Sequence, residues 1–227
     1  MIETTNVNAD VNAVVSLQTR DMPWEPMQHP GVSRKVLERV HDARKGRETA
    51  LFKLEPGASL PQERLEERLE FFVIEGRCSD GLGEYGRYTF VRNVPGTTIQ
   101  ITTDEGCELY VKRRVPIRPT GDERMVIDSQ TAQWMPFPHR GATVLHLYRD
   151  KHGIEVSRFG QVHPDKKIPS HDHAMGEETL VLDGELTDEY TVYKPGAWFR
   201  MPIGVPHAPY TGAAGCLMLI REGDLVW

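Results

Sequence analysis

The sequence predicts an all-β fold made of two tandem jelly-roll domains. Short segments rich in β-branched and aromatic residues alternate with Pro-Gly, Glu-Gly and Asp-Gly dipeptides, which are typical of tight turns. A Trp-x-Pro pattern that begins at Trp24 returns at Trp134, an offset of 110 residues. Many short strands with turns at close intervals favour a double-sheet jelly roll, and the repeat predicts two copies of it.

Two further landmarks support the duplication. Residues 61–76 align with residues 169–184 at an offset of 108, and Gly106-Cys107 aligns with Gly215-Cys216 at an offset of 109. A near-constant offset across separated landmarks indicates tandem duplication of one domain rather than a short solenoid repeat.

The expected boundary lies between the two copies. Two prolines and a glycine interrupt the strand pattern within residues 116–121. Such residues are typical of connecting segments. We therefore place a first domain at residues 1–118 and a second at residues 119–227.

Five segments have the clearest strand pattern. Each is a run of apolar or β-branched residues bounded by turn residues, and in chain order they are residues 71–74, 98–102, 107–111, 179–182 and 216–220. Helix is scarce, and one or two helical turns are predicted over residues 32–40. Residues 63–68 favour helix by propensity, but their counterpart in the second copy reads as a strand, so no helix is predicted there.

The second copy contains a group of metal-ligand residue types. His171 and His173 are two residues apart, so in a strand both side chains point to the same face. Glu177 follows four residues later, and His207 comes from a separate strand. Three neutral imidazoles and one carboxylate suit a divalent transition metal, and zinc, iron, nickel and manganese all remain open.

The first copy lacks this group. Across the repeat, the four ligand positions correspond to Glu63, Leu65, Leu69 and Ile99. One carboxylate and three aliphatic side chains cannot hold a transition metal, whereas the aliphatic ones can fill a barrel interior. We therefore predict one metal per chain, bound in the second domain.

Glycines and a proline frame the predicted ligands at fixed spacings: Gly184, Gly196, Pro202 and Gly204. The whole pattern resembles the two motifs of the cupin superfamily, G(x)5HxH(x)3–4E(x)6G and G(x)5PxG(x)2H(x)3N. Asp165 stands where the first glycine belongs, and Thr211 where the final asparagine belongs. The resemblance implies a bicupin, which is a tandem pair of jelly-roll (double-stranded β-helix) domains.

A wider set of residues resembles the cupin domain of ChrR-type anti-sigma factors. The set comprises the ligand residues together with Glu178, Asp188, Glu189, Tyr190, Arg200, Pro209 and the Gly215-Cys216 pair. In that family the matching positions bind zinc, which implies zinc ligation by His171, His173, Glu177 and His207. The anti-sigma factors also have an N-terminal domain with a His-x3-Cys-x2-Cys zinc motif that binds the sigma factor. This sequence contains no such motif.

Three functions remain open on these residues. The first and favoured one is a zinc-binding, ChrR-like protein of transcription regulation that senses an oxidant or a small molecule, with a sigma factor as a possible partner. The second is a metal-dependent enzyme, such as a dioxygenase acting on a small carbonyl or carboxylate compound. The third is a structural bicupin in which the metal only stabilises the fold. No Ser-His-Asp arrangement, phosphate-binding loop or dinucleotide fingerprint is discernible.

The composition and net charge of the chain limit the kinds of partner that we expect. With 39% hydrophobic and 26% charged residues the chain is globular, and its net charge of −6 argues against a nucleic-acid partner. No apolar run approaches the ~20 residues that span a bilayer, and the first twenty residues lack the pattern of a secretory signal. We expect a cytoplasmic homodimer without a membrane partner. Cys78, Cys107 and Cys216 form no CxxC pair and are expected to be buried.

Overall fold

The computed structural model of the chain describes residues 5–42, 46–114, 123–223 and 225. These residues form β-strands and two short 3-10 turns, η1 (Thr19–Asp21) and η2 (Pro138–Arg140), so the predicted all-β fold is confirmed. Nothing helical in the described part of the chain is long and apolar enough to cross a membrane.

The helical turns predicted over residues 32–40 are wrong. This segment is strand β3 (Val32–Val40), which pairs along its length with β4 (Arg47–Leu54). A bulge between Val36 and Glu38 interrupts the alternation of inward and outward side chains. The bulge blurs the period of two in the sequence, and strand pairing then outweighs the local helix propensity.

The chain divides into two compact units. The first contains the described residues of 5–9 and 23–132, and the second contains those of 10–22 and 133–225. Strand β1 (Val15–Gln18) pairs with β18 (Ala197–Met201) and belongs to the second unit. Its counterpart in the repeat, β12 (Met125–Asp128), pairs with β9 (Thr89–Asn93) in the first unit. The opening strand of each repeat therefore pairs with a strand of the other repeat and belongs to the unit that the other repeat mainly forms.

The boundary expected between residues 118 and 119 lies in a segment, 115–122, that is outside the described residues.

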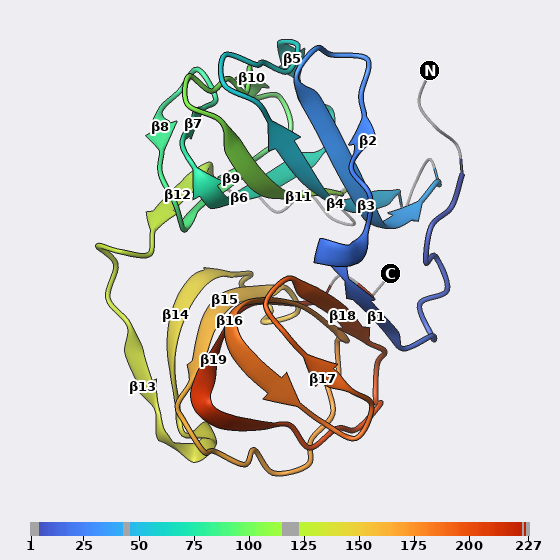
Figure 1. Cartoon of the computed structure of the whole chain (residues 1–227), viewed down its shortest axis with the longest axis vertical. Helices are drawn as coiled ribbons and strands as arrows, with labels where there is room; N and C mark the ends of the chain where they lie inside the picture. Colours follow the sequence, from blue (N-terminus) through green and yellow to red (C-terminus); the bar gives the residue numbers. More distant parts are fainter. Residues whose placement is uncertain (1–4, 43–45, 115–122, 224, 226–227) are drawn as a thin grey trace. The chain divides into compact units, whose positions relative to one another are not determined.

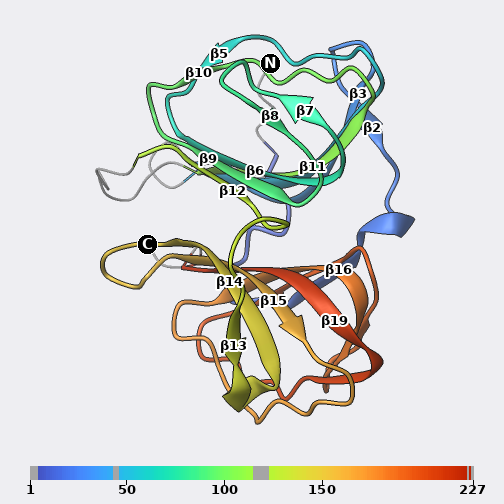
Figure 2. The same cartoon turned by 90° about the vertical axis from the view of Figure 1, so that its left-hand side faces the viewer.

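The first unit is built on one antiparallel sheet with strand order β12-β9-β6-β11-β4-β3-β2. Figure 2 shows β9, β6 and β11 side by side in this sheet. Two small ribbons, β5–β10 and β7–β8, complete the unit. The strands not yet given bounds are β2 (Glu25–Pro26), β5 (Glu63–Arg64), β6 (Arg68–Gly76), β7 (Cys78–Ser79), β8 (Glu84–Tyr85), β10 (Thr98–Ile99) and β11 (Cys107–Arg114).

The second unit repeats this plan with strand order β1-β18-β16-β19-β15-β14-β13, and β17 pairs with β16. Figure 1 shows these strands curving around a common interior. Their bounds are β13 (Met135–Phe137), β14 (Ala142–Arg149), β15 (Val156–Val162), β16 (Glu177–Thr187), β17 (Val192–Tyr193) and β19 (Tyr210–Glu222). The segments predicted as strands at 71–74, 107–111, 179–182 and 216–220 lie within β6, β11, β16 and β19, whereas only the start of 98–102 is a strand.

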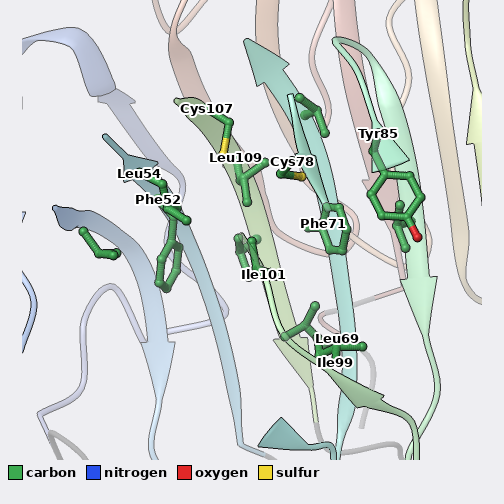
Figure 3. Close-up of a cluster of buried hydrophobic side chains, with 14 of the residues drawn as sticks. Phe52, Leu54, Leu69, Phe71, Cys78, Tyr85, Ile99, Ile101, Cys107 and Leu109 are labelled. Carbon is green, nitrogen blue, oxygen red and sulfur yellow. The ribbon is translucent and has the colours of Figure 1, made fainter. Parts of the chain in front are cut away.

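The interior of the first unit is hydrocarbon. Leu65, Leu69 and Ile99, which stand at three of the four ligand positions of the repeat, are at most 4% exposed and belong to its buried core. Figure 3 shows Leu69 and Ile99 among the core side chains. The replacement of ligands by aliphatic residues therefore fills the space that a metal site would need.

All three cysteines are free and buried, as expected. Cys78 and Cys107 lie in the core of the first unit, and Cys216 lies in the core of the second. Burial raises the pKa of the Cys216 thiol to about 12, so this thiol stays protonated. The cysteines act here as small apolar core residues.

Asp165, which replaces the first glycine of the cupin motif, adopts a backbone conformation that glycine favours. Asp165 has a φ of 55°, and its counterpart Gly57 has a φ of 78°, so both adopt the left-handed conformation. Aspartate enters this region more readily than most residues because its short side chain can bond locally. The turn that the missing glycine would form is therefore present.

Candidate metal centre

The three predicted histidine ligands meet in the second unit. His171 and His207 form an antiparallel bridge, with His171 N donating to His207 O at 3.0 Å and His207 N donating to His171 O at 2.9 Å. The same pairing joins Glu63 to Ile99 in the first unit. With His173, the rings offer ligand nitrogens that all lie within 4.8 Å of one another. Strand pairing therefore brings residues more than thirty positions apart into one cluster.

Two of the imidazoles are held by their outer nitrogens. His171 Nδ1 lies 2.9 Å from the carbonyl oxygen of Pro169, and His207 Nδ1 lies 3.2 Å from Asp188 Oδ2. An acceptor at Nδ1 fixes the proton there and leaves Nε2 as the ligand atom. His207 Nε2 and His173 Nε2 are 3.2 Å apart. The Nε2 atoms of His173 and His207 therefore face each other.

Asp188, which holds His207, is itself held by several donors. Its carboxylate accepts hydrogen bonds from Tyr190 N at 2.9 Å, Thr191 N at 3.2 Å and the Tyr193 hydroxyl at 3.1 Å. Burial raises the pKa of Asp188, but the hydrogen bonds from His207 and these three residues outweigh burial and lower it. Asp188 is therefore a fixed anion that orients the His207 ring.

Glu177 contacts the opposite edge of His173. Glu177 Oε2 lies 3.3 Å from His173 Nδ1, and the Thr179 hydroxyl donates to Glu177 Oε1 at 2.9 Å. The carboxylate thus belongs to a second group that could hold a metal ion, formed with His173 and Glu222. The His173 ring therefore lies between two predicted ligands, with His207 on its Nε2 side and Glu177 on its Nδ1 side.

Glu222 is a residue that the sequence analysis missed. Its carboxylate lies 3.5 Å from His173 Nδ1 and accepts a hydrogen bond from Arg158. Burial raises the pKa of Glu222, but the hydrogen bond with His173 and the charge of Arg158 outweigh burial and lower it to about 2. The period of two along β19 could have revealed it, because alternate residues enter the core: Cys216, Met218 and Ile220.

The surroundings of His171 and His173 shift the pKa values of the two imidazoles in opposite directions. Burial lowers the pKa of His171 to about 4, and the nearby positive charge of Arg140 acts in the same direction. Burial also lowers the pKa of His173, but the charges of Glu177 and Glu222 outweigh burial and raise it. At neutral pH, His171 is therefore neutral and able to coordinate, whereas the two carboxylates beside His173 favour its protonated form.

The corresponding place in the first unit has an internal ion pair. Glu63, the counterpart of His171, accepts hydrogen bonds from Arg113 Nη1 at 2.6 Å and from Arg113 Nη2 at 2.8 Å. A cavity of about 790 Å³ opens beside this pair and is lined mainly by charged side chains. Among the described residues, both groups able to hold a metal lie in the second unit.

Comparison with known protein families identifies the family of this chain. The profile described as ChrR Cupin-like domain matches residues 12–115 and again residues 122–226. The chain belongs to the ChrR cupin-like family. The two matches show that this member contains two tandem cupin domains, as the resemblance implied. A search of curated proteins found no match to this family member.

Solved structures share the fold of this ChrR cupin-like protein at low sequence identity. A candidate dioxygenase from Nostoc punctiforme superposes with a TM-score of 0.79 and 16% identity, covering 95% of this chain and 85% of that one. A candidate glyoxylate-induced protein from Pseudomonas aeruginosa gives 0.76 and 16%, covering 97% and 91%. A variant of Bacillus subtilis oxalate decarboxylase gives 0.67 and 12%, covering 96% and 80%.

Proposed function

We propose that the second unit binds one divalent transition metal through His171, His173 and His207, with Glu177 as the carboxylate ligand. The observation that carries this proposal is the convergence of three imidazole nitrogens within 4.8 Å, two of them with their outer nitrogens held by protein acceptors. Three nitrogens and one oxygen suit zinc, iron, nickel or manganese. Glu177 would turn from His173 towards the metal to complete this set.

We further propose that the metal is zinc and that the protein regulates transcription in response to an oxidant or a small molecule. Membership of the ChrR cupin-like family supports this role, because the resemblance to ChrR-type anti-sigma factors implies zinc at the matching positions. The residues would contribute a rigid site: Asp188 and the Pro169 carbonyl hold two imidazoles before the metal arrives. A sigma factor is the partner that the family suggests.

A metal-dependent enzyme is the second candidate. The half-buried His171 lies on the accessible side of the centre, and three imidazoles alone leave coordination positions for a small molecule. In that role the metal would act as a Lewis acid or bind oxygen, and Arg140, whose charge acts on His171, would attract a carboxylate. The candidate dioxygenase and the oxalate decarboxylase among the similar folds favour keeping this function.

Metal analysis of untagged protein purified without added metal tests the proposal. We expect about one equivalent per chain, and zinc would favour the regulator. Iron or nickel with oxygen consumption would favour the enzyme. Replacing His171 and His173 together by alanine should abolish binding, whereas His152→Ala is the matched control, since His152 is an exposed histidine of the same unit. Two equivalents that survive the double substitution would refute the site.

A pull-down from the native host distinguishes the regulatory role further. Recovery of a sigma factor with the wild-type chain, and its loss with the double histidine variant, is the expected result for a metal-dependent regulator. Equal recovery with both chains would show that the metal does not control the interaction.

A further inference from the structure

His173 has two carboxylates on the side that faces away from the other imidazoles. Its Nδ1 lies 3.3 Å from Glu177 Oε2 and 3.5 Å from Glu222 Oε1. A neutral imidazole that coordinates through Nε2 has a single N–H, at Nδ1, and one acceptor satisfies it. The second carboxylate is then available for another task.

The backbone fixes this arrangement. Glu177 at the start of β16 and Glu222 at the end of β19 are direct partners in the antiparallel register. Opposite residues in such a pair have side chains about 5 Å apart on the same face. Both side chains enter the interior, where Glu177 is 6% exposed as a residue and the Glu222 side chain is 22% exposed.

The two carboxylates differ in how they are held. Glu222 is ion-paired with Arg158, which projects from the neighbouring strand β15. Glu177 accepts a hydrogen bond from the Thr179 hydroxyl at 2.9 Å in addition to its contact with His173. A carboxylate bound by a guanidinium is fixed and a weaker metal donor, whereas one held by a hydroxyl can turn. Glu222 is therefore suited to hold the ring, and Glu177 to reach the metal.

The first unit gives independent support. The offset of 109 between the Gly-Cys pairs makes Arg113 the counterpart of Glu222. Arg113 faces Leu69 across the strands, as Glu222 faces Glu177, so the register agrees. Where the histidine and the glutamate ligand became leucines, the acid at this position was also lost. Such covariation within one chain is expected of a residue that serves the metal centre.

We propose that Glu222 is a positioning residue of the metal centre. It accepts the Nδ1–H of His173, so that this ring coordinates through Nε2 and Glu177 is released to become the fourth ligand. The inference rests on the metal site proposed above, and it adds a residue outside both cupin sequence motifs. An acceptor behind a metal-bound imidazole typically raises metal affinity by about 10- to 100-fold.

Metal affinity of the full chain tests the role. Wild type, Glu222→Gln and Glu222→Asp are titrated with Zn²⁺ against a chelating dye, and the absorption spectrum of the Co²⁺-loaded forms reports the ligand set. Glu222→Gln should weaken Zn²⁺ binding about 10- to 100-fold. It should leave one equivalent and the Co²⁺ spectrum unchanged, and Glu222→Asp should retain part of the affinity. Glu185→Gln, an exposed acid on β16, is the charge-matched control.

A proton resonance gives a readout that general destabilisation would not move. In the Zn²⁺-loaded wild type, the His173 Nδ1 proton should be visible as a slowly exchanging downfield signal, assigned through its correlation with the His173 ring nitrogen in ¹⁵N-labelled protein. That signal should shift or vanish in Glu222→Gln and persist in Glu185→Gln. If circular dichroism shows that Glu222→Gln is unfolded without metal, Glu222→Asp is tested instead. The proposal then requires a shifted His173 Nδ1–H signal in Glu222→Asp.

The possible results separate this inference from the metal site itself. A wild-type chain that binds no metal would refute the proposed function. Normal wild-type binding with an unchanged affinity and proton signal in Glu222→Gln would refute only the role of Glu222. A changed Co²⁺ spectrum in Glu222→Gln, or a second equivalent of metal in the wild type that this variant loses, would show that Glu222 is itself a ligand. Either result would overturn the positioning role.

Discussion

Removal of the metal should destabilise the second unit selectively. A ligand present at 100 times its dissociation constant adds about 2.7 kcal/mol to the free energy of unfolding. In a unit on the order of 100 residues, 1 kcal/mol changes the melting temperature by about 4–8 °C. Chelation should therefore lower the melting temperature of the second unit by about 10–20 °C.

The first unit should not respond, for a structural reason. Leu65, Leu69 and Ile99 fill its interior with at most 4% exposure, so the described side chains at these three ligand positions offer no polar group to a metal. In the second unit, metal removal leaves His173 Nε2 and His207 Nε2 facing each other at 3.2 Å without a shared cation. Buried polar atoms without an adequate partner cost free energy.

Differential scanning calorimetry with and without a chelator measures the effect. One thermal transition should separate into two, of which only the lower one moves when zinc is restored. His207→Ala should reproduce the chelated profile and should make the protein insensitive to chelator. If chelation lowers both transitions equally, the metal stabilises the whole chain, and the interpretation of the first unit as an independent structural domain is wrong.

Three further predictions address the centre, the turns and the assembly. Metal affinity should fall as the pH falls through the raised pKa of His173, because protons compete for the ligand nitrogen, and a titration showing no change between about pH 5 and 8 would contradict this. Gly184→Ala should destabilise the second unit by about 3 kcal/mol or more in urea unfolding, because its φ is 71° and a Cβ would lie 2.2 Å from Gly215 O. Gly204→Ala, with a φ of 74° and open space around it, should cost only about 1 kcal/mol. We also expect a homodimer, which light scattering tests, and a monomer at high concentration would remove that expectation without affecting the fold.

The architecture could be predicted because the duplication and the strand pattern can be read directly from the sequence. The sequence did not predict which strands pair with each other. The offset of 110 identifies residues 15–18 and 125–128 as equivalent, but it does not say which unit either strand joins. The structure pairs β1 with β18 and β12 with β9, so each opening strand pairs outside its own repeat. A repeat in sequence therefore need not be a unit in space.

The site was predictable where its residues follow a fixed spacing. The three histidines meet because strand pairing places His171 opposite His207, as their positions in the two motifs suggested. The residues that contact each imidazole ring were harder to predict from the sequence. Asp188 directly follows β16 and Glu222 ends β19, and no spacing rule connects them to the imidazoles they contact. Whether Glu177 contacts His173 or a metal is a matter of side-chain rotation, which a sequence does not specify.

The position shared by Arg113 and Glu222 shows how the two units balance charge. In the second unit, Glu177 and Glu222 both lie beside His173, and Arg158 pairs with Glu222. A divalent cation bound there would place its positive charge close to Glu177. In the first, Glu63 replaces an imidazole, and the cation is supplied by the chain itself as Arg113, bound through two hydrogen bonds. Loss of the metal ligands alone would have left Glu63 facing a second acid. The change of sign at this one position gives the Glu63 carboxylate a partner within the chain, while aliphatic side chains fill the other ligand positions.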